Sequence, residues 1–387
     1  MSLLEVKDLQ TYLNSGGQLV KAVDGVSFSI NRGETFCLVG ESGSGKSICA
    51  LSIIQLLPAG IASHPSGSIN FDWRKGTSGS GEQVDLLTLQ DDTLREVRGS
   101  RIAMIFQEPM TSLNPVFSIG GQIVEAIQLH NPELTEEVAK TQAIEALEQV
   151  QIKAASSRFN DYPHQLSGGQ RQRVMIAMAL ACKPDLLIAD EPTTALDVTV
   201  QAEILELMRD LQAEKGMAIL FITHDFGVVA QMAHQVGVMQ QGKLVEQGST
   251  KDVLLNPQHA YTQQLLAAVP ENLSRSTSQA FGINAESPEL ITVKDLEVWF
   301  PVRTGLFRRV TDHLKAVDKV DLSIRKGSIM ALVGESGCGK TTLGRAILQL
   351  EKPTAGSVKL DDQELTGLSA DQLRPTRPRI QIAFQDP

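Results

Sequence analysis

A glycine-rich stretch near the N-terminus carries the residues best suited to chemistry. Positions 40–47 read Gly-Glu-Ser-Gly-Ser-Gly-Lys-Ser, between apolar runs at 36–39 and 48–57. Glycines let successive backbone N–H groups converge on phosphate oxygens, and a helix that begins there adds the positive end of its dipole. Lys46 would reach the β- and γ-phosphates of ATP, and Ser47 would offer its hydroxyl to Mg²⁺. The predicted ligands in this loop are Gly40, Ser42, Gly43, Gly45, Lys46 and Ser47.

The same pattern recurs in the C-terminal part of the chain. Positions 334–341 read Gly-Glu-Ser-Gly-Cys-Gly-Lys-Thr, after an apolar run at 329–333 that we interpret as a strand. Because the flanking residues repeat as well, an accidental glycine-rich turn is a poor explanation, and one domain type is used twice. The corresponding predicted nucleotide ligands are Gly334, Gly337, Gly339, Lys340, Thr341 and Gln385, of which Thr341 and Gln385 are also predicted metal ligands.

The repeat sets the expected domain boundaries. We predict a first domain over 1–270, a polar linker over 271–288 and the N-terminal portion of a second domain over 289–387. The second copy ends before any counterpart of the residues that follow Pro109 in the first. We therefore expect this second domain to be incomplete in the chain as given.

Two adjacent carboxylates, Asp190 and Glu191, end an apolar run that we interpret as a buried strand. The carboxyl ends of parallel strands meet at one edge of a sheet, where the glycine loop also lies. Asp190 is predicted to hold Mg²⁺, and Glu191 to orient a water for attack on the γ-phosphate. His224 and Gln107 end two further predicted strands; His224 could donate to the γ-phosphate, and Gln107 could contact Mg²⁺ or the attacking water. A solvated strand end and a structural histidine are the alternatives.

A third element, Leu-Ser-Gly-Gly-Gln at 166–170, precedes a helical run at 171–181. A hydroxyl and two glycines at a helix start suit a second anion. The domain already holds one phosphate loop, so a second anion site makes sense if it faces the nucleotide of a partner domain. Two domains would then hold two ATP molecules between them in a head-to-tail arrangement. A plain glycine-rich helix start is the alternative. The residues concerned are Ser167, Gly168, Gly169 and Gln170.

Alternating strands and helices must position these groups. Short apolar runs at 35–39, 101–106, 186–189 and 217–223 predict buried strands of a parallel sheet, and the periodicity at 136–150 and 199–215 predicts amphipathic helices. The glycine-rich stretch 66–83 is interpreted as an exposed loop within an early antiparallel region.

Composition excludes several classes of protein. The chain has 387 residues, 42% hydrophobic, enough to bury a core in each of two domains. Its net charge of −10 argues against sequence-independent binding to nucleic acid. The four cysteines lack the spacing of a zinc or iron–sulfur site, and no apolar run reaches the about 20 residues that a membrane span needs. We expect a soluble chain whose membrane role, if any, comes through partners.

The motifs in this order resemble those of ABC-type ATPases: the phosphate loop at 40–47, the Gln107 loop, the signature at 166–170, the carboxylate strand at 186–191 and the switch histidine His224. Ala-Leu-Asp at 195–197 resembles the D-loop and adds Asp197 to the predicted nucleotide-site residues. The runs at 162–169, 190–197 and 257–262 are closer to the dipeptide/oligopeptide importer branch. The tandem arrangement resembles the fused two-ATPase subunit of peptide and microcin C importers.

This resemblance implies an α/β P-loop NTPase fold with a mixed-sheet core, an antiparallel β subdomain and a helical signature subdomain. It implies ATP hydrolysis with Mg²⁺, in which Glu191, His224 and Gln107 are catalytic, and a dimerising ATPase domain. The expected partners are two transmembrane permease subunits, docked near Gln107, and indirectly an extracytoplasmic substrate-binding protein. The expected location is the cytoplasmic face of the bacterial inner membrane, where the chain would act as a peripheral subunit.

An adenine-stacking aromatic is also expected in each copy, and Tyr12 and Phe300 are the candidates. Aligning Asp-Leu at 8–9 with Asp-Leu at 295–296, however, pairs Phe300 with Leu13 and Trp299 with Tyr12. The second copy, as given, contains no signature, carboxylate pair or switch histidine, so this chain completes neither nucleotide site by itself. Two alternatives to an importer subunit therefore remain: a non-transport ABC ATPase, as in translation or DNA repair, and a nucleotide-binding product without turnover.

Overall fold

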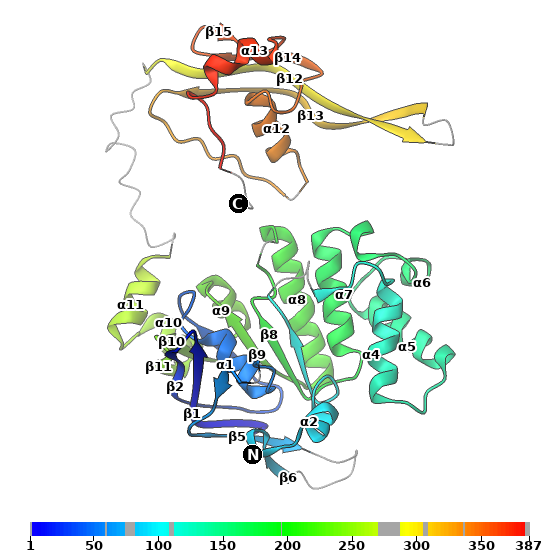
Figure 1. The fold of residues 1–387 in the computed structure, drawn as a ribbon, viewed down its shortest axis with the longest axis vertical. Helices are drawn as coiled ribbons and strands as arrows, with labels where there is room; N and C mark the ends of the chain where they lie inside the picture. Colours follow the sequence, from blue (N-terminus) through cyan, green and yellow to red (C-terminus); the bar gives the residue numbers. More distant parts are fainter. Residues whose placement is uncertain are drawn as a thin grey trace. The chain divides into compact units, whose positions relative to one another are not determined.

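The computed structural model describes residues 2–58, 60–73, 82–107, 112–194, 196–269, 287–304, 309–335 and 337–383. The chain divides into two compact units, Met1–Leu273 and Ser274–Pro387, which are described separately (Figure 1). Of the predicted linker 271–288, only the last two positions lie within the described residues.

A six-stranded mixed sheet forms the core of the first unit, in the order β11-β10-β3-β9-β8-β7. Five strands run parallel and β11 pairs antiparallel with β10. The four strands predicted from apolar runs are confirmed, because such runs are buried on both faces in a parallel sheet. The strands are β3 (Thr35–Val39), β7 (Ile102–Ile105), β8 (Leu186–Asp190), β9 (Ala218–Thr223), β10 (Gln235–Gln240) and β11 (Lys243–Ser249).

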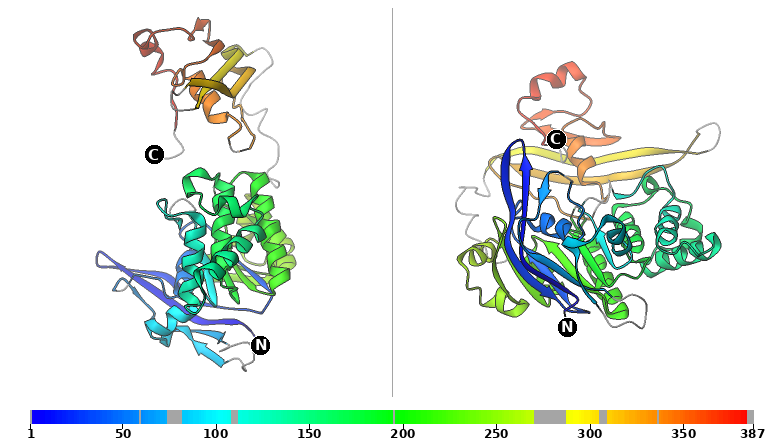
Figure 2. Two further views of the ribbon diagram at one scale, coloured as in Figure 1. Left: turned by 90° about the vertical axis from the view of Figure 1, so that its right-hand side faces the viewer. Right: turned by 60° about the horizontal axis from the view of Figure 1, so that its bottom comes forward.

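Side chains of this sheet alternate between two hydrophobic clusters. In β3, Cys37 and Val39 join one cluster, and Phe36 and Leu38 join the other. Helices cover the first face, and an antiparallel sheet and α1 cover the second (Figure 2). The helices of the first unit are α1 (Lys46–Ile53), α2 (Asp91–Val97), α4 (Ile119–His130), α5 (Glu136–Gln149), α6 (Ala155–Arg158), α7 (Gly168–Leu180), α8 (Val198–Lys215), α9 (Phe226–Met232), α10 (Thr250–Leu255) and α11 (Ala260–Ala267).

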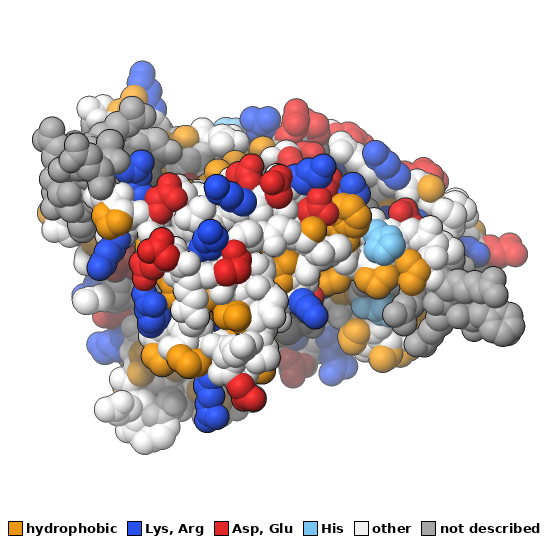
Figure 3. Space-filling model, turned by 90° about the horizontal axis from the view of Figure 1, so that it is seen from above, with side chains coloured by type: hydrophobic (Ala, Val, Ile, Leu, Met, Phe, Trp, Pro, Cys, Tyr) orange, Lys and Arg blue, Asp and Glu red, His pale blue; other side chains and the backbone are white. Residues whose placement is uncertain are grey.

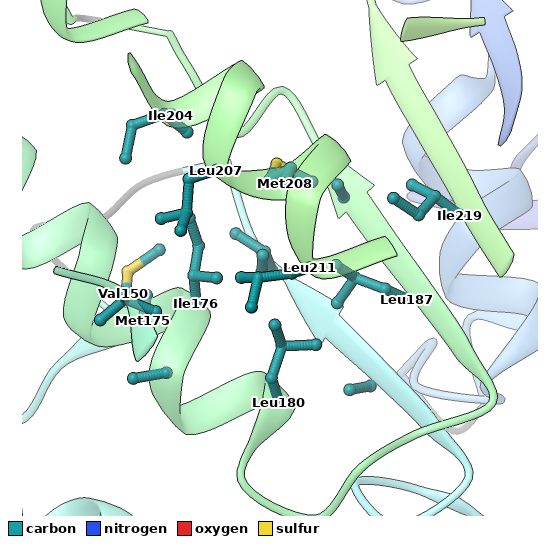
Figure 4. Packing of buried hydrophobic residues seen from close by; sticks show 14 of the residues in the cluster. Val150, Met175, Ile176, Leu180, Leu187, Ile204, Leu207, Met208, Leu211 and Ile219 are labelled. Atoms are coloured by element: carbon teal, nitrogen blue, oxygen red, sulfur yellow. The ribbon is translucent and has the colours of Figure 1, made fainter. Parts of the chain in front are cut away.

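The helix α7, which follows the signature, packs on α8 through apolar side chains (Figure 4). Met175, Ile176 and Leu180 of α7 face Leu207 and Leu211 of α8 in this view. All five are buried in the same cluster. Truncating a buried leucine of this kind to alanine costs about 2–5 kcal/mol, so this packing holds the signature region firmly on the sheet.

The antiparallel sheet of the first unit contains a strand that the sequence interpretation missed. Residues 68–73 form β5, which pairs with β1 and β6, so the predicted loop at 66–83 is wrong over these positions. Ile69 and Phe71 point into the core at period two, and this burial outweighs the surrounding glycines. Residues 74–81 lie outside the described part. The strands are β1 (Leu4–Ser15), β2 (Gln18–Ile30), β4 (Ala62–Ser63), β5 (Ser68–Trp73) and β6 (Glu82–Asp85).

The second unit repeats the beginning of the first. Its sheet has the order β13-β12-β14-β15. The helix α12 begins at Lys340, the lysine of the second glycine-rich loop. The predicted strand at 329–333 is wrong: these residues form no strand, and Ile329 and Val333 are 89% and 85% exposed. The equivalent β3 is paired on both sides by β10 and β9, which have no counterpart among the described residues of this unit. The elements are β12 (Glu289–Thr304), β13 (Arg309–Arg325), α12 (Lys340–Ile347), β14 (Ala355–Leu360), β15 (Gln363–Glu364) and α13 (Ala370–Leu373).

Acidic and basic side chains are intermixed across the face drawn in Figure 3. Within the described ranges, no helix combines the length and the apolar character that crossing a bilayer requires.

Candidate functional site

The loop between β3 and α1 requires glycine at two positions. Gly40 and Gly45 have φ of 151° and 103°, which L side chains rarely adopt. A Cβ on Gly40 would lie 2.2 Å from the carbonyl oxygen of Met239, and one on Gly45 would lie 2.2 Å from that of Ala22. The loop is therefore pressed against β10 and β2, which holds its backbone in place.

Lys46 opens α1 and turns back onto the loop. Its Nζ donates to the carbonyl oxygens of Gly40 and Glu41 over 2.8 and 2.9 Å, and to Oγ of Ser44 over 3.4 Å. Burial lowers the pKa of this ammonium group, and the nearby carboxylates of Glu191 and Asp190 only partly oppose that effect. An incoming anion would therefore meet a desolvated cation held by carbonyls that it could replace.

The carboxylates predicted from sequence do reach the loop. Asp190 ends β8, and its Oδ1 accepts a hydrogen bond from Oγ of Ser47 over 3.1 Å. Asp190 is 5% exposed, and burial raises the pKa of its carboxyl. Ser47 and Asp190 together offer two hard oxygen ligands at the start of α1.

Glu191 is the hub of a polar network. Its Oε2 accepts from Nε2 of Gln107 over 3.1 Å and from Oγ1 of Thr194 over 2.9 Å, and its Oε1 lies 3.2 Å from Nδ1 of His224. Burial would raise the pKa of Glu191, but the hydrogen bonds from His224 and Thr194 outweigh it and leave the pKa below its usual value. Glu191 also has φ of 46°, a left-handed conformation that costs a non-glycine residue about 1–3 kcal/mol and occurs often at functional sites.

The predicted signature residues lie elsewhere in the first unit. Oγ of Ser167 accepts from the N–H of Gln170, and Oε1 of Gln170 accepts from the N–H of Ser167, which caps α7. Ser167, Gly169 and Gln170 line a hollow of about 720 Å³, whereas the phosphate loop lines a separate one of about 500 Å³. Gly168 begins α7, and Asp197 caps α8 through the N–H of Val200. The fold thus does not bring the signature to the loop of its own unit.

The second glycine loop has the same local geometry as the first. Nζ of Lys340 donates to the carbonyl oxygens of Gly334 and Glu335 over 2.7 and 2.6 Å. Gly337 and Gly339 have φ of 83° and 101°, against 79° and 103° at their counterparts in the first loop. Thr341 lies exposed in the first turn of α12. Gln385 lies outside the described residues.

The structure does not support Tyr12 as an adenine-stacking residue. Its hydroxyl donates to Asp24 over 3.1 Å, and the ammonium group of Lys21 lies 5.1 Å from its ring centroid. Leu13, the next residue of β1, lines the hollow beside the phosphate loop instead. Tyr12 is not among the residues that line this hollow. Phe300, the counterpart of Leu13, is 36% exposed on β12.

Sequence reasoning also missed two residues of the site. Thr194 reaches Glu191, and the hydroxyl of Tyr261 accepts from the N–H of Glu41 in the loop over 3.2 Å. No local pattern signals the Tyr261 contact, because the partners are 220 positions apart. For Leu13 the sequence did contain a signal, because the alignment of the two copies pairs it with the candidate Phe300.

Comparison with known proteins identifies the family. The family model described as "ABC transporter" matches residues 23–194 and 317–387, which is more than half of the chain. The chain belongs to the ABC transporter family. The model "Oligopeptide/dipeptide transporter, C-terminal region" matches residues 245–295. This ABC protein is an ATP-binding subunit of the oligopeptide/dipeptide branch, with an ABC ATPase fold, as the motifs predicted.

Three relatives match over the whole chain. The Peptidoglycan transport ATP-binding protein YejF of Agrobacterium fabrum is 51% identical over 385 residues, 67% of its own length. The Glutathione import ATP-binding protein GsiA of Pectobacterium atrosepticum and the Uncharacterized ABC transporter ATP-binding protein YejF of Escherichia coli are each 46% identical, over 64% and 70% of their lengths. The ABC protein described here thus spans about two thirds of the length of these relatives.

Solved structures of single cassettes resemble about two thirds of the chain. A dimeric post-hydrolysis state of the ATP-binding cassette MJ0796, bound to ADP and Pi, matches with TM-score 0.55 and 27% identity, covering 64% of this chain and 98% of that one. The cbiO1 protein of Clostridium perfringens, part of the ABC transporter complex cbiONQ, matches with TM-score 0.54 and 30% identity, covering 66% of this chain and 91% of that one.

Proposed function

We propose that this protein binds and hydrolyses ATP to drive the import of peptides or peptide-like compounds through a membrane transporter. One observation carries the enzymatic part. The end of β8 delivers Asp190 to Ser47 beside the phosphate loop, and places Glu191 in contact with Gln107 and His224. Residues from four distant parts of the chain are thus joined by hydrogen bonds beside the phosphate loop.

The residues at this edge fit a magnesium ion. Hydroxyl, carboxylate and amide oxygens of Ser47, Asp190 and Gln107 are the donors that Mg²⁺ prefers, and Mg²⁺ usually takes one or two protein ligands together with phosphates and water. Among the described residues no group of three or more His, Cys, Asp or Glu side chains could hold a metal alone. Bound Mg²⁺ supplies positive charge to the phosphate oxygens. In the second unit, Thr341 and Gln385 are the proposed counterparts.

The side chains of the first unit then have distinct tasks. Lys46 exchanges its loop carbonyls for phosphate oxygens. Glu191, whose pKa lies below its usual value, is ionised at neutral pH; it accepts a hydrogen bond from water and orients it for attack on the γ-phosphate. His224 and Gln107, which contact the carboxylate of Glu191 in this structure, sense the γ-phosphate and transmit its presence to the rest of the domain. Leu13 offers an aliphatic surface to the base.

The signature residues are proposed to act across a dimer. Ser167, Gly169 and Gln170 line a hollow separate from the loop of their own unit, so a nucleotide would reach them from another domain. Gly168, which begins α7 between them, is proposed to act with them. Asp197, at the start of α8, is proposed to lie at the same interface. The dimeric state described for MJ0796 supports this arrangement.

The transport role rests on the branch of the family. The segment 245–295 matches the oligopeptide/dipeptide C-terminal region, and two relatives are named for peptidoglycan transport and glutathione import. Peptidoglycan and glutathione both contain amide bonds between amino acids. We propose two transmembrane permease subunits as direct partners, docked near Gln107, and an extracytoplasmic binding protein as an indirect one. The ATPase would then lie at the cytoplasmic face of the bacterial inner membrane.

ATP turnover tests the enzymatic part. We expect Mg²⁺-dependent hydrolysis that rises more than linearly with protein concentration, because two first units must pair. Glu191→Gln, a change of one atom, should lower turnover about 10²- to 10⁴-fold and leave ATP binding intact. Hydrolysis that Glu191→Gln does not reduce, or the absence of hydrolysis by a chain that binds ATP, would contradict the proposal.

Uptake tests the transport part. Vesicles that carry the permease subunits, the binding protein and this ATPase should accumulate a labelled short peptide when ATP is present inside. Matched vesicles with the Glu191→Gln protein provide the control. If the ATPase does not co-purify with the permease subunits, the importer assignment fails and a non-transport ATPase is favoured.

A further inference from the structure

The part of the first unit that follows β10 holds the phosphate loop at two places. The N–H of Gly242, in the turn between β10 and β11, donates to the carbonyl oxygen of Ser44 over 2.9 Å. The N–H of Glu41 donates to the hydroxyl of Tyr261 over 3.2 Å. The first contact comes from the sheet itself, whereas the second comes from α11, a helix that lies beyond it. A separate element therefore reaches the loop with a single hydroxyl group.

Tyr261 is held in place before it meets the loop. It is 6% exposed, and its ring belongs to the hydrophobic cluster of the helical face. The start of α11 is tied to β11, because the carboxylate of Glu246 accepts from the N–H groups of Gln258 and His259 over 2.7 and 3.1 Å. Nδ1 of His259 then accepts from the N–H of Tyr261 over 3.2 Å. These contacts fix the position of the hydroxyl without help from the loop.

The hydroxyl contact bears on Lys46 through the peptide group between Gly40 and Glu41. The N–H of this group, that of Glu41, is held by Tyr261, and its carbonyl oxygen, that of Gly40, accepts from Nζ of Lys46 over 2.8 Å. Fixing the N–H therefore fixes the orientation of the carbonyl group that accepts from the lysine. Through Tyr261, the helix α11 thus sets the direction of the first backbone N–H groups of the loop. It also sets the position of the Lys46 ammonium group when no nucleotide is bound.

We propose that Tyr261 is a positioning residue for the phosphate loop, and that α11 sets the affinity of this loop for nucleotide phosphates through it. The proposal rests on the proposed function only in that the loop binds ATP. Tyr261 acts through Glu41 and Lys46 and does not itself meet the nucleotide. All the tethering residues fall within 245–295, the segment matched by the oligopeptide/dipeptide C-terminal model.

The decisive variant is Tyr261→Phe, which removes the hydroxyl and keeps the buried ring. Mg·ATP affinity is measured on the full chain carrying Lys340→Ala, so that binding reports on the first loop. Loss of one neutral hydrogen bond corresponds to about threefold to tenfold weaker binding. We expect the KM for ATP to rise by this factor while kcat stays nearly unchanged. Gln264→Ala, an exposed position on α11, is the matched control and should change neither constant.

Two further measurements separate positioning from a general structural role. Hydrogen exchange of the Glu41 amide without nucleotide should become faster in Tyr261→Phe, while the amides of β8 and β9 keep their protection. Glu246→Gln, which loosens the start of α11 and does not contact the loop, should shift the affinity in the same direction.

The outcomes are distinct. Unchanged ATP affinity with unchanged Glu41 exchange overturns the inference. A reduced fraction of active protein with unaltered affinity also overturns it, because that marks a purely structural role. If the parent chain binds no ATP, the proposed function fails instead, and the exchange of the Glu41 amide still decides whether Tyr261 positions the loop.

Discussion

The hydroxyl of Ser47 donates to Oδ1 of Asp190 over 3.1 Å, although the two residues are 143 positions apart. The contact joins the first turn of α1 to the carboxyl end of β8. Burial raises the pKa of Asp190, and the hydrogen bond from Ser47 is the main effect that opposes it. A bound cation would stabilise this buried carboxylate in its charged form, which is why we propose the metal site here.

Asp190→Asn should weaken the metal site and leave the nucleotide loop in place. The amide keeps the shape of the side chain and one oxygen that can accept from Ser47, but it loses the negative charge. We expect the Mg²⁺ concentration for half-maximal ATP turnover to rise at least about tenfold, in the range of a lost metal-site partner. ATP affinity measured without metal should stay close to that of the parent. An unaltered Mg²⁺ requirement would remove Asp190 from the metal site.

Gly45→Ala should destabilise the first unit more than Gly43→Ala. Both glycines have positive φ, and a left-handed alanine costs about 1–2 kcal/mol in each case. At Gly45 the new Cβ would also meet the carbonyl oxygen of Ala22 at 2.2 Å, whereas at Gly43 it meets nothing within 4 Å. Urea unfolding followed by far-UV circular dichroism checks the order. Equal midpoints for the two variants would show that the loop moves away from β2 at little cost.

Glu246→Gln should lower thermal stability at neutral pH and have little effect in acid. Burial opposes ionisation of Glu246, but hydrogen bonds, foremost the one from the N–H of Gln258, together outweigh it and hold the pKa below its usual value of 4.5. A lowered carboxyl pKa stabilises the fold above the unfolded pKa, and this contribution is lost as pH falls through the folded pKa. The difference in Tm between parent and variant should therefore shrink below pH 4.5. Glu133→Gln, at an exposed position, is the control and should show no such pH dependence.

Cys338 should be the first cysteine to react with N-ethylmaleimide. It is exposed in the second phosphate loop, whereas Cys37 and Cys49 are buried, and burial raises the pKa of Cys49 to about 12. Modification of Cys338 should abolish nucleotide binding at the second loop, and bound Mg·ATP should slow the modification. Cys338→Ser should resist the reagent and still bind nucleotide at the second loop, since Ser44 occupies the equivalent position in the first loop. Loss of binding in the treated serine variant would point to another target.

The sequence by itself determined the family, the repeat and the main layers of the fold. The glycine spacing marked both loops because only glycine accepts their backbone angles. The apolar runs marked β3, β7, β8 and β9 because a strand buried on both faces must be apolar throughout. The acids at the end of β8 could be placed near the loop for a topological reason: parallel strands bring their carboxyl ends to one edge. The roles given to these residues stay predictions.

Only the tertiary structure decided which side chains meet. The register of β1, shifted between Thr11 and Tyr12, turns Leu13 and not Tyr12 toward the loop. The apolar run at 329–333 forms no strand, because a central strand exists only when neighbours pair with it. The hydroxyl of Tyr261 reaches Glu41 because Glu246 ties α11 to the sheet edge. Local patterns record periodicity and backbone preference, whereas these three outcomes depend on strand register, on pairing partners and on contacts between distant segments.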